Sequence, residues 1–159
     1  MEKRKMELED IDRIVEITRI AWDGVTMHKL LEDSHGVIGD KRWYERKIEE
    51  VVNFCKNNPS NVIVAIEEGK VVGCATYIIN YNDKIGIVEN NAVDVAYQVR
   101  GIKTAMNKWI IDFFCKEKLK IAMVSTLAND IPAKKVYEKN GFKEIAHTIH
   151  YTLALEKKC

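Results

Sequence analysis

The stretch Gln98-Val99-Arg100-Gly101-Ile102-Lys103 lies between a strand-like run that ends near Val95 and a helix-like run that begins near Gly101. A strand that enters a helix through a glycine turn presents unpaired backbone N–H groups and the positive end of the helix dipole. These features suit a pyrophosphate, and Arg100 and Lys103 add positive charge beside them. One glycine at the start of a helix is by itself more typical of an ordinary turn, so the junction needs a second signal before it indicates a site.

On either side of this junction the sequence predicts strands and helices of a single domain, residues 1–159. The strand–helix–strand unit after residue 85 implies a parallel pair with a right-handed crossover. A hairpin at Glu68-Gly69-Lys70 implies an antiparallel part. The fold class is therefore α/β, with a mixed, partly antiparallel sheet and flanking helices. The expected strands are 2–6, 62–67, 71–79, 85–95, 121–126 and 142–155, the expected helices are 8–21, 41–56, 101–117 and 132–140, and residues 23–40 are expected to be irregular.

Composition argues against several classes of protein. The formal net charge is +1 and no basic block occurs, so no nucleic-acid partner is expected. No apolar run approaches the roughly 20 residues that span a bilayer, and no apolar stretch follows the basic N-terminus, so we expect neither a membrane partner nor a secretory signal. The four cysteines form no metal-binding pattern, so no metal site is expected. We expect Cys55, Cys74 and Cys115 to be reduced core thiols of a cytoplasmic protein and the terminal Cys159 to be exposed.

A second motif is found downstream, at Ala133-Lys134-Lys135-Val136-Tyr137-Glu138-Lys139-Asn140-Gly141-Phe142. Its spacing, Ala-x-x-x-Tyr-x-x-x-Gly-Phe, resembles the C-terminal signature of the GNAT superfamily of N-acetyltransferases. The junction resembles the same family's coenzyme A signature, Gln/Arg-x-x-Gly-x-Gly/Ala, with Gln98 and Gly101 at the matching positions. Both motifs stand in the family's order with a strand between them. The resemblance implies the acyl-CoA N-acyltransferase (GNAT) fold, with acetyl-CoA as co-substrate and no metal.

The resemblance also implies which residues hold the coenzyme. Lys103 stands where the family keeps a small residue, and a lysine there either adds a cation near the phosphates or crowds the pocket. Val95 stands where the family usually has proline. Asn129 and Asp130 are both candidates for the asparagine that the family places seven residues before the tyrosine. The implied coenzyme-binding residues are Val93, Asp94, Val95, Gln98, Val99, Arg100, Gly101, Ile102, Lys103, Thr104, Asn129 and Asp130.

The chemistry that the resemblance implies is direct attack of a substrate amine on the thioester. The amine must first lose a proton, because a lysine-like amine has a pKa of about 10.4. Glu89 is the best candidate for the base, since period-two counting places it on the strand face of Val93; a surface carboxylate without a role is an equally good interpretation. Family members stabilise the thioester carbonyl with a backbone N–H of the strand, here residues 93–95. The resemblance assigns Tyr137 as the proton donor to the leaving thiolate.

The acceptor is left open as a primary amine of a small molecule or a peptide. In this family the region that corresponds to residues 23–40, with His28 and His35, helps to shape the acceptor site. His147 and His150 are expected on opposite sides of the last strand, so that either both are ordinary strand residues or one of them reaches that site. We assign none of the four histidines a role. A homodimer is also expected, because small members of the superfamily often pair.

Three function classes fit these features. The first is an N-acetyltransferase, the second a non-catalytic acyl-CoA-binding or sensing protein, and the third an interaction module that has lost the coenzyme. Binding of acetyl-CoA separates the third class from the other two. Release of thiol with a panel of amines separates the first class from the second.

Overall fold

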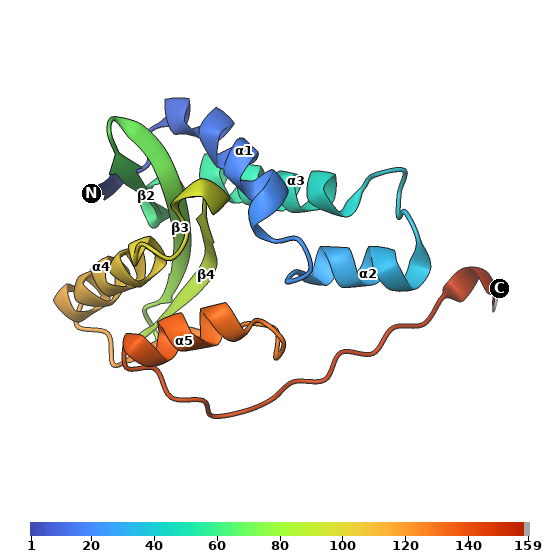
Figure 1. The fold of residues 1–159 in the computed structure, drawn as a ribbon. Helices are drawn as coiled ribbons and strands as arrows, with labels where there is room; N and C mark the ends of the chain where they lie inside the picture. Colours follow the sequence, from blue (N-terminus) through green and yellow to red (C-terminus); the bar gives the residue numbers. More distant parts are fainter. Residues whose placement is uncertain (158–159) are drawn as a thin grey trace.

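The structure, a computed structural model, describes residues 1–157 and shows a five-stranded sheet with helices packed on both faces (Figure 1). The strands lie side by side in the order β1-β2-β3-β4-β5, antiparallel from β1 to β4 and parallel between β4 and β5. The mixed α/β architecture and the parallel pair are therefore confirmed. The strands are β1 (Glu2–Lys5), β2 (Val62–Glu67), β3 (Lys70–Asn80), β4 (Ile85–Val93) and β5 (Ile121–Val124), and the helices are α1 (Ile11–Ala21), α2 (Met27–His35), α3 (Trp43–Asn57), α4 (Ile102–Lys116) and α5 (Ile131–Lys139), with 3-10 turns at Leu8–Asp10, Pro59–Asn61, Val95–Tyr97 and Leu155–Lys157.

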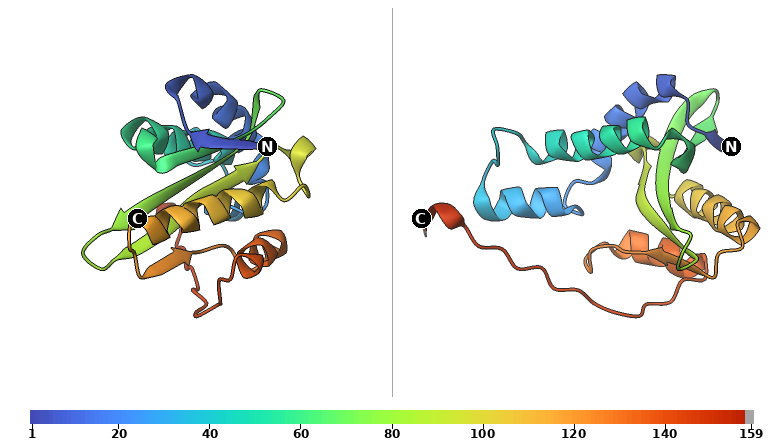
Figure 2. Two further views of the ribbon diagram at one scale, coloured as in Figure 1. Left: turned by 90° about the vertical axis from the view of Figure 1, so that its left-hand side faces the viewer. Right: turned by 180° about the vertical axis from the view of Figure 1, so that it is seen from behind.

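Two apolar cores lie on opposite faces of this sheet. Helices α1 and α3 cover one face, where Ile14, Val51 and Cys55 are fully buried against the strands (Figure 1). Helix α4 covers the other face with Met106 and Ile110 (Figure 2). Strand β3 lies between the two cores and is buried along most of its length. Burial of apolar surface on both faces fixes the position of β4, whose end forms part of the site.

A β-bulge interrupts β4 in the middle of the sheet. Ala75 of β3 pairs with Asn91, whereas Tyr77, two residues later, pairs with Val88. Strand β4 therefore carries one more residue than β3 in this interval. A bulge of this kind bends the strand and redirects its side chains, and bulges are frequent beside active sites.

The bulge corrects one expectation from the sequence. Val88 and Val93 face the same core although they are five residues apart, which strict alternation does not allow. The period-two count that placed Glu89 on the face of Val93 therefore does not hold across the bulge. Glu89 lies within this interval and is exposed, whereas Val93 is buried.

Two neighbouring asparagines hold the bulge from both faces of the sheet. On one face, Asn90 Oδ1 accepts a hydrogen bond from Lys47 Nζ of α3 at 2.7 Å, and the Asn90 N–H donates to Thr76 Oγ1 at 2.9 Å. On the other face, Asn91 Nδ2 donates to Asn107 Oδ1 of α4 at 2.9 Å. All of these side chains are buried, where a lost partner is costly. The bulge is thus tied to α3 and to α4 at once.

Beyond the bulge the sheet opens. Strand β5 pairs with β4 only over Ile85–Val88 and Ile121–Val124, whereas β4 continues to Val93. Within residues 1–157, the edge of β4 that faces β5 has no strand partner over residues 89–93. This opening is the place where a ligand can lie between the two parallel strands.

Two expectations about regular structure are wrong. Residues 23–40 were expected to be irregular, but α2 occupies Met27–His35, and Gly24 and Gly36 flank it. Helix α2 has only nine residues and buries none of them completely, although Met27, Leu30 and Leu31 stand at helical spacing. The strand expected at 142–155 is absent from the sheet: this segment runs extended and largely exposed, without a paired strand among the described residues.

Two of the three cysteines in residues 1–157 lie in the core as expected, and the third does not. Cys55 and Cys74 are buried free thiols, whereas Cys115 is a free thiol that is exposed rather than part of the core. Cys159 lies outside the described residues. No helix between residues 1 and 157 is long and apolar enough to cross a bilayer. No cluster of three potential metal ligands occurs in this part of the chain.

Candidate active site and coenzyme turn

The turn that leads into α4 has the geometry of an anion site. Gly101 is the N-cap of α4 and has a left-handed backbone with φ 77°, which glycine adopts without strain. No side chain within the described chain caps this helix end, so the first-turn N–H groups remain available to a ligand. Val99 is also left-handed, with φ 64°, and its side chain is fully exposed. A β-branched residue in this region is strained, and such strain is concentrated at functional loops.

The charged side chains of the turn are partly engaged elsewhere. Arg100 forms an ion pair with Glu67 at 3.6 Å, and its guanidinium lies 5.0 Å from the centre of the Tyr97 ring. The Asp94 carboxylate accepts a hydrogen bond from the Ala96 N–H at 2.9 Å and pairs with Arg13 of α1. These bonds lower the pKa of Asp94. The side chain of Asp94 therefore holds the turn in place, and only its backbone is left to face a coenzyme.

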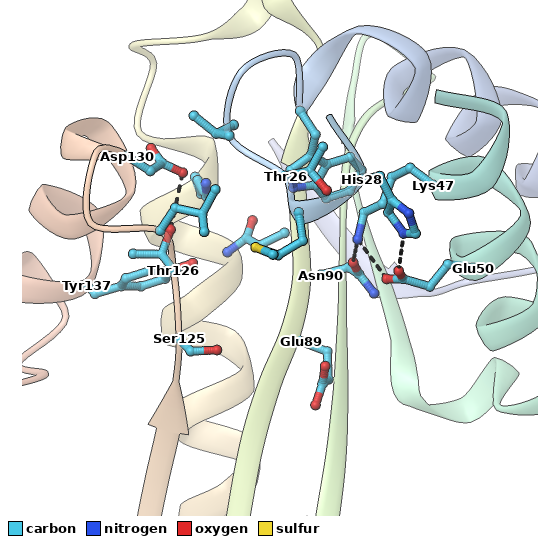
Figure 3. Close-up of a pocket in the computed structure, with 16 residues that line it drawn as sticks. Thr26, His28, Lys47, Glu50, Glu89, Asn90, Ser125, Thr126, Asp130 and Tyr137 are labelled. Atoms are coloured by element: carbon cyan, nitrogen blue, oxygen red, sulfur yellow. Dashed lines mark hydrogen bonds and ion pairs between the residues drawn. The ribbon is translucent and has the colours of Figure 1, made fainter. Parts of the chain in front are cut away.

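A cleft of about 330 Å³ lies where β4 and β5 separate (Figure 3). Its walls come from the segment that joins α1 to α2 with the first turn of α2, from α3, from the bulge of β4, from the start of α4, and from the loop after β5 with α5 (Figure 3). Four residues that the sequence singled out line it together: Glu89, Lys103, Asp130 and Tyr137. The fold thus brings the two candidate catalytic residues into one cavity from positions almost fifty residues apart.

Tyr137 lies half-buried on the α5 wall of the cleft (Figure 3). Its ring makes an edge contact with Phe142, with 6.0 Å between the ring centroids. Burial, together with the nearby charge of Asp130, raises the pKa of Tyr137 to about 12. The hydroxyl is therefore protonated at neutral pH and suited to donate a proton.

Glu89 lies on the β4 wall, across the opening from Ser125 and Tyr137 (Figure 3). It is exposed, and within residues 1–157 its carboxylate forms no ion pair. A carboxylate that is free on the wall of a cleft can accept a proton directly or through one water molecule. Glu89 therefore stays the candidate base. What supports it is its place on the wall of the cleft, and not the strand face that period-two counting gave it.

Lys103 and Asp130 both line the cleft. Lys103 is half-buried, and this burial lowers its pKa against the opposing effect of the Asp130 charge. Asp130 caps α5, where its carboxylate accepts hydrogen bonds from the Ala133 N–H at 3.1 Å and from Thr126 Oγ1 at 3.3 Å. Asn129, the other candidate for this position, is not among the residues that line the cleft. Of the two, Asp130 is thus the one placed to meet a ligand.

A polar network on the opposite wall was not found from the sequence. Lys47 Nζ donates to Glu50 Oε1 at 2.7 Å in addition to Asn90, and it lies 4.9 Å from the centre of the Trp22 ring. His28 Nε2 lies 2.7 Å from Glu50 Oε2 (Figure 3). Although burial opposes it, the contacts with Lys47 and His28 lower the pKa of Glu50. This wall therefore carries charges of both signs.

One signal in the sequence marks this network. Lys47 occupies the buried stripe of α3, between Trp43 and Val51, at four-residue spacing. A lysine in the apolar stripe of an amphipathic helix is rarely buried unless it is paired. The other histidines lie elsewhere: His147 and His150 do not line the cleft, and His35 contacts Thr152.

Comparison with known proteins agrees with this geometry. The sequence model of the acetyltransferase (GNAT) family matches residues 24–142. N-acetylaspartate synthetase of Xenopus tropicalis is 26% identical over 129 residues, which are 72% of this chain and 48% of that protein. The Danio rerio protein of the same name is 29% identical over 100 residues, which are 63% of this chain and 36% of that protein. The chain thus spans less than half the length of these curated relatives.

Solved structures share the fold. The PaiA N-acetyltransferase of Thermoplasma acidophilum, in complex with coenzyme A, matches with a TM-score of 0.71 at 18% identity, over 89% of each chain. The ribosomal-protein-alanine N-acetyltransferase of Brucella melitensis matches with a TM-score of 0.66 at 16% identity, over 92% of this chain and 86% of that one. Since the family match includes both the coenzyme turn and the Tyr137 motif, the chain belongs to the acetyltransferase (GNAT) family.

Proposed function

We propose that the protein transfers the acetyl group of acetyl-CoA to a primary amine by direct attack, with Glu89 as the base and Tyr137 as the acid. The observation that carries this proposal is the cleft that holds Glu89 and Tyr137 on opposite walls (Figure 3), with Lys103 of the first turn of α4 also among its lining residues. Bound acetyl-CoA supplies the acetyl thioester. The residues present fit it, because α4 starts at an uncapped left-handed glycine with open space around its Cα.

A backbone N–H at the end of β4 is the donor that we propose for the thioester carbonyl of acetyl-CoA. The Asp94 N–H donates to Val72 O on β3 at 2.9 Å. Because successive N–H groups of a strand point to opposite edges, the Val93 N–H is directed to the edge that β5 leaves unpaired. A donor at this edge is placed to stabilise the negative charge that develops on the thioester oxygen. Glu89 takes the proton of the attacking amine, and Tyr137 gives a proton to the departing sulfur.

Two observations guide the choice of an acceptor amine: the names of the curated relatives, and the charged side chains on the cleft wall around Lys47. The curated relatives are named N-acetylaspartate synthetase, so aspartate is the first acceptor to test. An amino acid carries both an ammonium and carboxylates, and the wall presents Glu50 together with Lys47 and His28. Peptide amines and polyamines form the comparison set. The cytoplasmic location and the homodimer stay predictions.

The test of the proposed function is release of free thiol from acetyl-CoA with each acceptor. We expect turnover with at least one amine, and a kcat/KM that rises with pH because a larger fraction of the amine is neutral. No fall is expected until the pH approaches the Tyr137 pKa of about 12, since the proton donor remains protonated below it. Coenzyme binding without thiol release from any amine would favour the non-catalytic acyl-CoA-binding protein. Absence of both would contradict the proposal.

Lys103 gives a separate prediction for the coenzyme. Because Lys103 lines the cleft where the family keeps a small residue, we expect Lys103→Ala to tighten acetyl-CoA binding about five- to tenfold, or roughly 1 kcal/mol. Lys103→Met is the matched control, because it keeps the bulk and removes the charge. Calorimetric titration measures both variants. Weaker binding by both would show instead that the ammonium contacts the phosphates.

A further inference from the structure

The first turn of helix α2 brings backbone N–H groups without partners to the cleft. Thr26 is the N-cap of this nine-residue helix, and its hydroxyl does not cap the helix end. The N–H groups of Lys29 and Leu30 both donate to Thr26 O, at 3.1 and 3.2 Å. The N–H groups of Met27 and His28, the first two of the helix, have no partner within residues 1–157. Because Thr26, Met27 and His28 line the cleft, these donors are available to a molecule that lies in it.

The hydroxyl of Thr26 is a further polar group without a partner. Thr26 is only 7% exposed, and its Oγ1 atom forms no hydrogen bond in the described part of the chain. Figure 3 shows this side chain on the cleft wall beside His28 and Lys47. A buried hydroxyl is normally hydrogen-bonded, because an unpaired polar group loses its contacts with water on burial. An unpaired hydroxyl in the wall of a cleft is therefore placed for a ligand.

Lys47 adds a buried positive charge to the same wall. It is 8% exposed and lines the cleft. Two of its three N–H groups donate to Glu50 Oε1 and to Asn90 Oδ1, both at 2.7 Å. Apart from the Trp22 ring, 4.9 Å away, the third N–H has no partner among residues 1–157. Glu50 is engaged through both oxygens, since His28 Nε2 lies 2.7 Å from its Oε2, so its negative charge is offset and Lys47 keeps one donor for a ligand.

Together these groups fit a carboxylate. Backbone N–H groups, a hydroxyl and an ammonium all donate hydrogen bonds, and the positive end of the helix dipole favours an anion. The first turn of α2 contains no acidic residue that could occupy this place. The pyrophosphate of the coenzyme has a separate candidate site at Gly101, the start of α4. The carboxylate expected at α2 therefore belongs to the acceptor.

The position of Glu89 limits the kind of acceptor. Lys47 is bonded to Asn90, and Asn90 follows Glu89, the proposed base, in the chain. Both neighbours line the cleft, at the bulge of β4. A carboxylate at Lys47 and an amine at Glu89 are therefore close together, as they are in a free α-amino acid, where one carbon carries both groups. The first residue of a peptide has no free carboxylate on that carbon, and a polyamine has no carboxylate at all.

We propose that the first turn of α2, the Thr26 hydroxyl and Lys47 bind the α-carboxylate of a free amino acid, and so select free amino acids over peptides and polyamines. The proposal rests on the proposed acetyl transfer and names the class of its acceptor. The amine of the bound amino acid lies toward Glu89, and its side chain extends into the rest of the cleft.

The first test compares an amino acid with its own α-amide, which keeps the amine and the side chain but lacks the carboxylate. Thiol release is measured with L-aspartate, L-leucine and L-lysine and with the α-amide of each. Rates are expressed per neutral amine, because the amide lowers the pKa of the amine. We expect kcat/KM for the best acid to exceed that for its amide about 30-fold, since charge-assisted hydrogen bonds are lost. An amide that reacts as fast as its acid, or a faster reaction with a peptide or a polyamine, overturns the proposal and leaves acetyl transfer standing.

Two variants test whether the named side chains cause this preference. Thr26→Val keeps the shape of the side chain and removes the unpaired hydroxyl, so we expect the acid-to-amide ratio to fall about fivefold. Lys47→Met removes the charge and should lower the ratio about tenfold. Thr18→Val is the matched control, because the Thr18 hydroxyl donates to Ile14 O within α1 at 2.7 Å and lies outside the cleft. Circular dichroism checks that each variant is folded, and a ratio that no folded variant of Thr26 or Lys47 lowers overturns the proposal.

A binding measurement separates failure of this proposal from failure of acetyl transfer. Calorimetric titration of the CoA-saturated protein with the same acids and amides requires no turnover. If no amine is acetylated, the proposed function fails, but about 30-fold tighter binding of the acid that Thr26→Val weakens still supports the carboxylate site. Equal affinity for the acid and the amide, or no binding of either, overturns it.

Discussion

Replacement of Tyr137 by phenylalanine is expected to lower kcat about 100-fold and to leave the Kd for acetyl-CoA almost unchanged. The phenylalanine ring keeps the packing against Phe142, so the cleft retains its shape. What is lost is the hydroxyl, which the high pKa of about 12 keeps protonated and which we propose as the proton donor to the leaving sulfur. Steady-state kinetics with the best acceptor and calorimetric titration of acetyl-CoA measure the two effects separately.

The control for this substitution is Tyr81→Phe. Tyr81 is exposed and its hydroxyl contacts Glu117 outside the cleft, so the same chemical change there should not alter kcat. A Tyr137→Phe enzyme with the kcat of the unmodified protein would remove Tyr137 from the role of acid. An equal loss in kcat and in coenzyme affinity would indicate a binding role instead.

Glu89→Gln should lower kcat/KM at neutral pH about 100-fold, because glutamine cannot accept the proton of the attacking amine. The deficit should shrink as the pH rises toward the pKa of the acceptor amine, about 10.4 for a lysine-like group, since the amine then reacts without a base. The measurement is the ratio of kcat/KM between the unmodified protein and the variant across the pH range.

Glu138→Gln is the matched control for Glu89. Glu138 follows Tyr137 on α5 but is exposed and does not line the cleft. Its substitution should change neither the rate nor the pH profile. A constant ratio between Glu89→Gln and the unmodified protein at every pH would show that Glu89 acts through electrostatics or structure and not as a base.

The helix boundaries and the parallel strand pair could be predicted from the sequence, because they depend on residues that are close together along the chain. The start of α4 at Ile102 follows from Gly101 and the apolar stripe after it, and the end of α5 follows from Gly141. The parallel pairing of β4 with β5 follows from the strand–helix–strand order, because the helix between the two strands forms the crossover connection that parallel strands need. Local conformational preference and periodicity are sufficient for these features.

The features that were missed depend on contacts between distant segments. The bulge of β4 arises from its pairing with β3 and from the bonds of Asn90 and Asn91 to two different helices. The wall around Lys47 requires α2 and α3 to lie together, which no single segment specifies. Residues 142–155 have the alternation of a strand, but alternation does not identify the edge with which a strand pairs.

The short pairing between β4 and β5 has a consequence for the stability of the apo protein. Because only Ile85–Val88 and Ile121–Val124 are paired, we expect the segment from β5 through α5 to have a lower free energy of local opening than strands β2 and β3. A ligand that lies between β4 and β5 binds only the closed form, and at 100 times its Kd it adds about 2.7 kcal/mol to that opening free energy. We therefore expect amide hydrogen exchange and proteolysis to act first on the segment from β5 through α5, and acetyl-CoA to slow both of them there.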